Sequence, residues 1–189
     1  MVMKINGISG SFSVPRVVKN YVFTKFDAKM SANVAGTSKT VDIKSALESA
    51  WQGAVQRSRQ KPCSDYFKTL FRQKTLAEVM NEGDIVFHCL EPKTGFDYSI
   101  LPDANTAGRD IGIDPTLFFG SDPAALVCTI IHELAHVAGA STDAGAAVEK
   151  AHAAEKALLS CSCKKQYRKD VLGSIRDLRS GAGSGSRYA

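Results

Sequence analysis

Three features that would assign this 189-residue chain to common protein classes are absent from its sequence. No apolar run approaches the length of a transmembrane helix, so we expect no membrane span. The N-terminal segment MVMKINGISGSFSVP lacks the continuous apolar stretch of a secretory signal peptide. No CxxC pair is present, which argues against a structural zinc knuckle.

The net charge and the cysteine content are also modest. The formal charge is +5 at pH 7, with Lys and Arg spread along the chain and clustered only near the C-terminus, so we expect no nucleic-acid partner. The five cysteines are an odd count, which, without a signal peptide, favours reduced thiols in a cytosolic producer. For a protein acting outside that compartment, the candidate disulfide joins Cys63 to Cys161 or Cys163.

The length and composition indicate one domain with a sizeable core. The hydrophobic fraction of 44% and the charged fraction of 23% are ordinary for a globular protein. The sequence contains no internal repeat, and its Gly/Ser-rich end, residues 181–189, is expected to be disordered. We therefore predict a single α+β domain over residues 1–180, with a small mixed sheet and several helices.

Hydrophobic periodicity and turn residues place the elements along the chain. Strands are expected within residues 2–24 and at 84–90, 96–101 and 110–114, with loops at 27–40 and 102–109. Helices are expected at 41–59, 64–71, 75–80, 146–159 and 164–178. Trp51 is predicted to anchor the core. His88 is predicted to be a packed or hydrogen-bonded strand residue outside any site.

The stretch SDPAALVCTIIHELAHVAGA, residues 121–140, has the signals of a capped helix with two different faces. Ser121 and Asp122 are N-cap types, Pro123 suits the first helical position, and Gly139 provides a stop. The residues that recur at helical spacing on a core face are Val127, Ile130, Ile131, Leu134 and Ala138. On the opposite face, the small side chains expected to leave room for a substrate are Ala125, Cys128 and Thr129.

His132, Glu133 and His136 form the pattern HExxH within this helix. Residues i and i+4 lie above one another on one helix face, so the two imidazoles can share one tetrahedral Zn²⁺ ion. Glu133 points about 100° around the helix, where it can act as general base on a water held by the metal. The sequence therefore predicts His132 and His136 as metal ligands and Glu133 as the catalytic residue.

A catalytic zinc normally takes three protein ligands and one water, so a third ligand is needed. The extended pattern HExxHxxGxxH is broken, because Thr142 stands where its third histidine would fall. The remaining downstream candidates are Asp143, Glu149, His152 and Glu155. His152 and Glu155 share a helix face, and three of the four histidines fall between residues 132 and 152.

The segment HELAHVAGA is similar to the zincin metallopeptidases. Together with HAAEKALLSC, it resembles the zincin-type domains of bacterial polymorphic toxins and secretion-system effectors, over about residues 110–163. This resemblance implies a zincin-like fold and a glutamate as third ligand, which falls on Glu155. The aspzincin peptidases would instead use Asp143, but Ala146-Ala147 replace the Tyr-Gly that follows that aspartate. Glu155 is therefore ranked before Asp143, and Asp143 before His152.

The predicted function is zinc-dependent hydrolysis of an amide bond in a protein or a peptidoglycan peptide. Glu133 would take a proton from the attacking water and return it to the leaving amine, while His152 or Tyr167 would stabilise the oxyanion. The effector-like resemblance implies a toxin exported by a dedicated secretion system to the periplasm or a target cell, with an immunity or inhibitor protein as partner.

The alternative from another class is a non-catalytic, zinc-stabilised binding module. An intact Glu133 argues against this alternative, because a purely structural site has no use for a general base. A structural zinc site would also close its fourth position with a protein ligand.

Overall fold

The computed structural model of this chain describes residues 3–8, 16–18, 21–93, 104–120, 122–140 and 153–163. Within them the chain is α+β, with small sheets and several helices, which confirms the predicted class. The strand expected at 96–101, the basic helix expected at 164–178 and the tail at 181–189 lie outside the described residues. The predicted extent of the domain, residues 1–180, reaches beyond them as well and stays a prediction.

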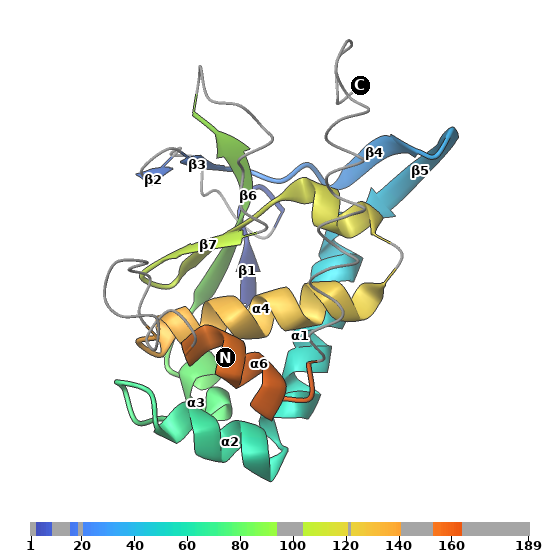
Figure 1. The fold of residues 1–189 in the computed structure, drawn as a ribbon. Coiled ribbons are helices and arrows are strands. Elements are labelled where there is room, and N and C mark those ends of the chain that lie inside the picture. The colour runs from blue at the N-terminus through green and yellow to red at the C-terminus, as the bar shows by residue number, and fades with distance from the viewer. Residues whose placement is uncertain are drawn as a thin grey trace.

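The main sheet of the described residues is mixed, and β6 is its central strand (Figure 1). One side of β6 pairs with β1 in parallel and with β3 in antiparallel orientation, and its other side pairs in parallel with β8. The strands of this sheet are β1 (Met3–Ile5), β2 (Arg16–Val18), β3 (Tyr21–Thr24), β6 (Ile85–Pro92), β7 (Ala104–Ala107) and β8 (Asp110–Ile113). The strand predicted at 84–90 is thus confirmed as β6.

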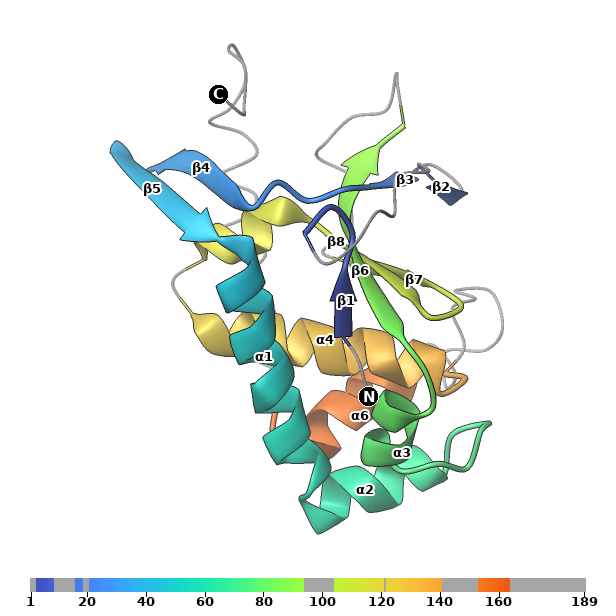
Figure 2. The same cartoon turned by 180° about the vertical axis from the view of Figure 1, so that it is seen from behind.

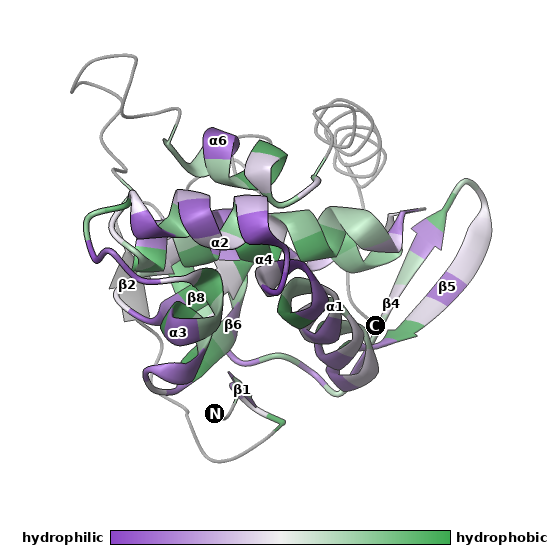
Figure 3. Ribbon diagram, turned by 90° about the horizontal axis from the view of Figure 1, so that it is seen from below, coloured by the Kyte–Doolittle hydropathy of each residue, from purple (hydrophilic) through white to green (hydrophobic). Residues whose placement is uncertain are grey.

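The helices pack around α4, which lies between the sheet and the group formed by α2, α3 and α6 in both Figure 1 and Figure 2. The helices are α1 (Ile43–Ser58), α2 (Lys61–Lys68), α3 (Leu76–Asn81), the 3₁₀ helix η2 (Pro115–Phe119), α4 (Pro123–Val137) and α6 (Ala153–Ser160). Because α4 contacts α1, α3, α6 and β7, its residues Ile130, Ile131 and Leu134 are fully buried. Figure 3 accordingly shows the part of α4 that α2 leaves uncovered as hydrophobic.

Local signals explain where the shorter helices begin. Thr75 and Glu78 form the predicted capping box at the start of α3, each side chain accepting a hydrogen bond from the other's backbone N–H. α2 begins at Lys61, three residues earlier than expected, because Pro62 lies in the first turn instead of interrupting the helix. A proline there loses no hydrogen bond, since the first N–H groups of a helix have no partner within it.

The predictions for Trp51 and His88 are confirmed. Trp51 is 5% exposed, and its ring packs edge-on against that of Phe87 with centroids 5.9 Å apart. His88 is buried, and its Nδ1 lies 3.0 Å from Asn6 Nδ2 while its Nε2 lies 2.9 Å from Asp110 Oδ1. His88 therefore joins the end of β1 to β8 across the central strand.

The expectation of a loop over residues 27–40 is wrong, because this segment lies in an antiparallel hairpin of β4 (Lys29–Val34) and β5 (Thr37–Asp42). Ala35 and Gly36 form the turn with φ angles of 49° and 80°, the two positive values that a tight hairpin turn requires. Most of β5 is exposed on both faces, so the chain has no apolar alternation there for a sequence pattern to detect.

The expectation of a loop over residues 102–109 is also wrong, because β7 pairs with β8 as a second hairpin. Gly108 makes the turn with a φ of 70°, which glycine adopts without strain. The residues of β7 are Ala, Asn, Thr and Ala, which lack the β-branched and aromatic enrichment typical of a strand. This hairpin bears on the site because β7 contacts α4.

No helix in the described ranges is both long and apolar enough to cross a membrane.

Candidate metal centre

α4 carries the HExxH residues, and its ends follow the predicted signals. The Asp122 side chain accepts a hydrogen bond of 2.8 Å from the backbone N–H of Ala124, and Pro123 opens the helix. Ser121, the other expected cap, lies outside the described residues. The helix stops at Val137, and Gly139 follows with a φ of 98°, in the left-handed conformation expected after a helix.

The two histidines of the motif face one another across one helical turn. Nε2 of His132 lies 3.1 Å from Nε2 of His136. Two nitrogen ligands of a tetrahedral zinc ion, each 2.0–2.1 Å from the metal, are separated by about 3.3 Å. The chemistry and spacing of this donor pair therefore fit zinc.

A backbone carbonyl orients one of these rings. Nδ1 of His136 lies 3.1 Å from the carbonyl oxygen of Ala140, just beyond the end of α4. Since a carbonyl only accepts, this hydrogen bond places the ring proton on Nδ1 and leaves the Nε2 lone pair directed toward His132. Ligand histidines generally make such a bond with their other nitrogen.

Glu133, the residue after His132, is buried, with 4% of its surface exposed. Thr106 of β7 donates a hydrogen bond of 2.6 Å from Oγ1 to Oε2 of the Glu133 carboxylate. Sequence reasoning missed Thr106 because it assigned the residue to a loop. Gly108 in the two-residue turn Gly108-Arg109, just before the apolar strand at Ile111, is the signal that could have indicated the hairpin.

α6 brings Glu155 to the same histidine pair. Oε1 of Glu155 lies 3.9 Å from Nδ1 of His132, and both side chains are mostly buried. This nitrogen is not the one that faces His136, so two roles fit the geometry. Glu155 is therefore a candidate both for the third ligand and for an outer partner that orients His132.

The remaining ligand candidates are not placed. Asp143, Glu149 and His152 lie outside the described residues, as does Tyr167, the other candidate for oxyanion stabilisation. Among the residues that the structure describes, no three His, Cys, Asp or Glu side chains form a complete metal-binding group. The identity of the third ligand therefore stays a prediction.

Two disulfides hold α6 against its neighbours. Cys63 of α2 is bonded to Cys161 with a Cα–Cα distance of 4.3 Å, and Cys128 of α4 is bonded to Cys163 with a distance of 5.8 Å. The first pair confirms one of the two candidate disulfides, whereas nothing in the sequence indicated the second. The expectation of reduced thiols is wrong for these four residues.

The second disulfide also corrects the expectation of open space along α4. Cys128 is 6% exposed because Cys163 covers it, and Ala125 is 6% exposed as well. The expectation is therefore wrong for Ala125 and Cys128, which are buried, whereas Thr129 is half-buried. The fifth cysteine, Cys89, is buried in β6, and burial raises the pKa of its thiol far above its usual range.

Comparisons with protein-family models, with curated proteins and with solved structures give no match to this chain.

Proposed function

We propose that this protein is a zincin-like metallopeptidase, which hydrolyses an amide bond in a protein or a peptidoglycan peptide. The observation that carries the proposal is the 3.1 Å approach of the Nε2 atoms of His132 and His136. Two imidazoles at this spacing suit one zinc ion. Glu133 follows directly on the same helix, and Glu155 lies beside His132, so a general base and a further carboxylate accompany the pair.

Each residue has a distinct role in this proposal. When bound, zinc would supply Lewis-acid chemistry and lower the pKa of a coordinated water toward ~7. His132 and His136 hold the metal, and Glu155 completes the ligand set. Glu133 accepts a proton from the attacking water and delivers it to the leaving amine.

The position of β7 supports a peptide as substrate. β7 stands at the end of the strand order of the main sheet, within the described residues, and its Thr106 contacts Glu133. An edge strand has backbone N–H and C=O groups that an extended peptide can pair with. A peptide bound along β7 would therefore lie close to the general base.

The two disulfides support a site of action outside a reducing compartment, because such bonds form and persist in oxidising surroundings. We place this action in the periplasm or in a target cell, with an immunity or inhibitor protein as an additional partner. Expression in a bacterial host with and without a periplasmic export signal tests this part. Growth inhibition is expected only with the signal, and a zinc-loaded protein that is harmless in both compartments contradicts it.

The burial of Glu133 favours a second candidate function, a non-catalytic module that zinc stabilises. Incubation of the zinc-loaded protein with a peptide library and with purified peptidoglycan separates the two candidates. Hydrolysis that disappears in a zinc-retaining Glu133→Gln variant supports the peptidase. Zinc-dependent folding without hydrolysis of either substrate supports the module.

A further inference from the structure

We infer that Thr106 is a positioning residue for Glu133, whose carboxylate it holds in the orientation in which that group acts as general base. This inference rests on the proposed function and adds a residue to the same site. Oγ1 of Thr106 lies 2.6 Å from Oε2 of Glu133 and 3.4 Å from its backbone carbonyl oxygen. Because both oxygens of Glu133 only accept, the threonine hydroxyl is the donor.

A short hydrogen bond to a charged acceptor is well suited to this role. Bonds between a hydroxyl and a carboxylate are about twice as strong as bonds between neutral groups. The bond to Oε2 restricts rotation of the carboxylate about its last side-chain torsion, so the direction of Oε1 is set as well. Glu133 therefore keeps one orientation beside His132 without being a metal ligand.

The hairpin that carries Thr106 is itself anchored by Arg109, which lies in the turn between β7 and β8. The Arg109 guanidinium donates from Nη2 to the carbonyl oxygens of Val79 and Gly83, at 2.9 and 3.0 Å, and from Nε to that of Asp84 at 3.3 Å. These carbonyls belong to the end of α3 and to the connection into β6. Arg109 thus fixes the hairpin turn to the body of the domain.

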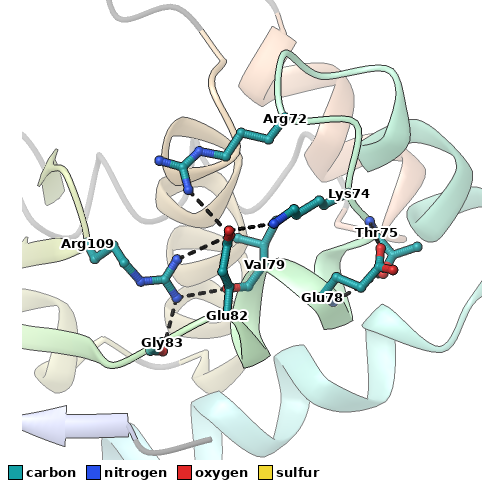
Figure 4. Close-up of polar contacts among 8 residues, drawn as sticks. All are labelled: Arg72, Lys74, Thr75, Glu78, Val79, Glu82, Gly83 and Arg109. Carbon is teal, nitrogen blue, oxygen red and sulfur yellow. Dashed lines mark hydrogen bonds and ion pairs between the residues drawn. The ribbon is translucent and has the colours of Figure 1, made fainter.

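The Glu82 carboxylate connects Arg109 to Arg72, whose backbone contacts the C-cap of α4. Figure 4 shows Arg72, Lys74 and Arg109 converging on Glu82, which pairs with Lys74 and lies 3.4 Å from Arg72 Nη1 and 3.8 Å from Arg109 Nη1. The hydrogen bond from Lys74 lowers the pKa of the Glu82 carboxyl, so this group is ionised at neutral pH. The backbone N–H of Arg72 also donates to the Ala138 carbonyl at 3.1 Å.

This set of contacts connects both partners of the Thr106–Glu133 bond through one network. The hairpin turn is held through Arg109, and the C-cap of α4 is held through the backbone of Arg72. The two strands of the hairpin are also paired along their whole described length, from Ala104 opposite Ile113 to Ala107 opposite Asp110. Positioning of a catalytic group requires such support, because a displacement of about 1 Å can cost 10²-fold in rate.

The test compares variants with and without the hydroxyl. Thr106→Val removes the donor and keeps the shape, whereas Thr106→Ser keeps the donor. The matched control is Thr24→Val in β3, a half-buried strand threonine whose hydroxyl donates to the Cys89 carbonyl at 3.5 Å, away from Glu133. Zinc content, kcat and KM are measured for each variant on a substrate that the wild type cleaves.

We expect Thr106→Val to retain zinc and KM while kcat falls by about 10- to 100-fold, as expected for loss of a hydrogen bond to a charged group. Thr106→Ser should restore most of kcat, and Thr24→Val should match the wild type. Equal kcat in Thr106→Val and wild type would overturn the inference. Equal losses in the Val and Ser variants would also overturn it, because the hydroxyl would then be irrelevant.

A second readout does not depend on turnover. The melting temperatures of metal-free wild type, Thr106→Val, Glu133→Gln and the double variant form a thermodynamic cycle. Non-additive shifts are expected from a direct bond, and additive shifts would overturn the inference. If the wild type hydrolyses nothing, the proposed function fails, and non-additive shifts would then assign the bond to stability alone.

Discussion

Cys128, which precedes His132 by one turn of α4, is bonded to Cys163 just beyond the end of α6. The neighbouring Cys161 is bonded to Cys63 of α2. Since α6 carries Glu155, the two disulfides hold this carboxylate against the helix that bears the histidines. The geometry of the proposed zinc site therefore depends on the oxidation state of four cysteines.

Reduction of the disulfides is expected to weaken both the fold and the zinc site. Loss of one native disulfide typically costs about 2–5 kcal/mol of stability. A Cys128→Ser/Cys163→Ser variant should therefore unfold at lower denaturant concentration and bind zinc more weakly than the wild type, as measured by denaturant titration and competition with a chelator. The control is Cys89→Ser, which removes the cysteine outside both disulfides. Unchanged zinc affinity in the double variant would show that the zinc site does not depend on this disulfide.

The cysteine assignments predict a specific thiol count. Native protein should not react with a thiol reagent at pH 8, because burial raises the pKa of the Cys89 thiol and shields it. Denaturation without reductant should expose one thiol per chain, and denaturation with reductant should expose all five cysteines of the sequence. More than one thiol before reduction would show that a disulfide is absent.

Glu133→Gln separates catalysis from metal binding. Glutamine keeps the size and polarity of the side chain but cannot accept a proton, so activity should fall by at least ~10²-fold. Zinc content should stay near that of the wild type, because Glu133 is not assigned as a ligand, and the variant should remain folded as judged by circular dichroism. Retained hydrolysis would remove Glu133 from the role of general base.

The third ligand is tested by its effect on metal affinity. Loss of a residue that only orients a ligand lowers metal affinity by about 10- to 100-fold. If Glu155 is itself a ligand, Glu155→Ala should lower zinc affinity by more than this. Asp143→Ala and His152→Ala are measured alongside, and each should bind zinc nearly as well as the wild type. If Asp143→Ala loses zinc while Glu155→Ala retains it, the aspzincin-like assignment replaces ours.

The motif helix could be predicted from the sequence because its signals are local. The cap at Asp122, the proline at position 123, the stop at Gly139 and the i, i+4 spacing of the histidines lie within a short stretch, and the structure shows each of them. The α+β class and the central strand were also predictable from local signals. A short run of apolar and β-branched residues indicates a buried strand, whichever segments pair with it.

The rest of the site could not be predicted, because it depends on contacts between segments that are distant in sequence. Thr106 and Glu133 are 27 residues apart, and Cys128 and Cys163 are 35 apart. The strand that brings Thr106 to Glu133 consists of small and polar residues, so its pairing with β8 determines its structure more than its own composition does. The hairpin at Ala35 is a local pairing, and it was missed because the mostly exposed residues of β5 show no apolar alternation.

Zinc content is the measurement that tests the central claim most directly. Elemental analysis of gently purified wild type should give about one zinc per chain, as two histidines and one further ligand imply. A His132→Ala/His136→Ala variant that remains folded, as judged by circular dichroism, should contain none. Wild type without stoichiometric metal, or a double variant that keeps its zinc, would contradict the account.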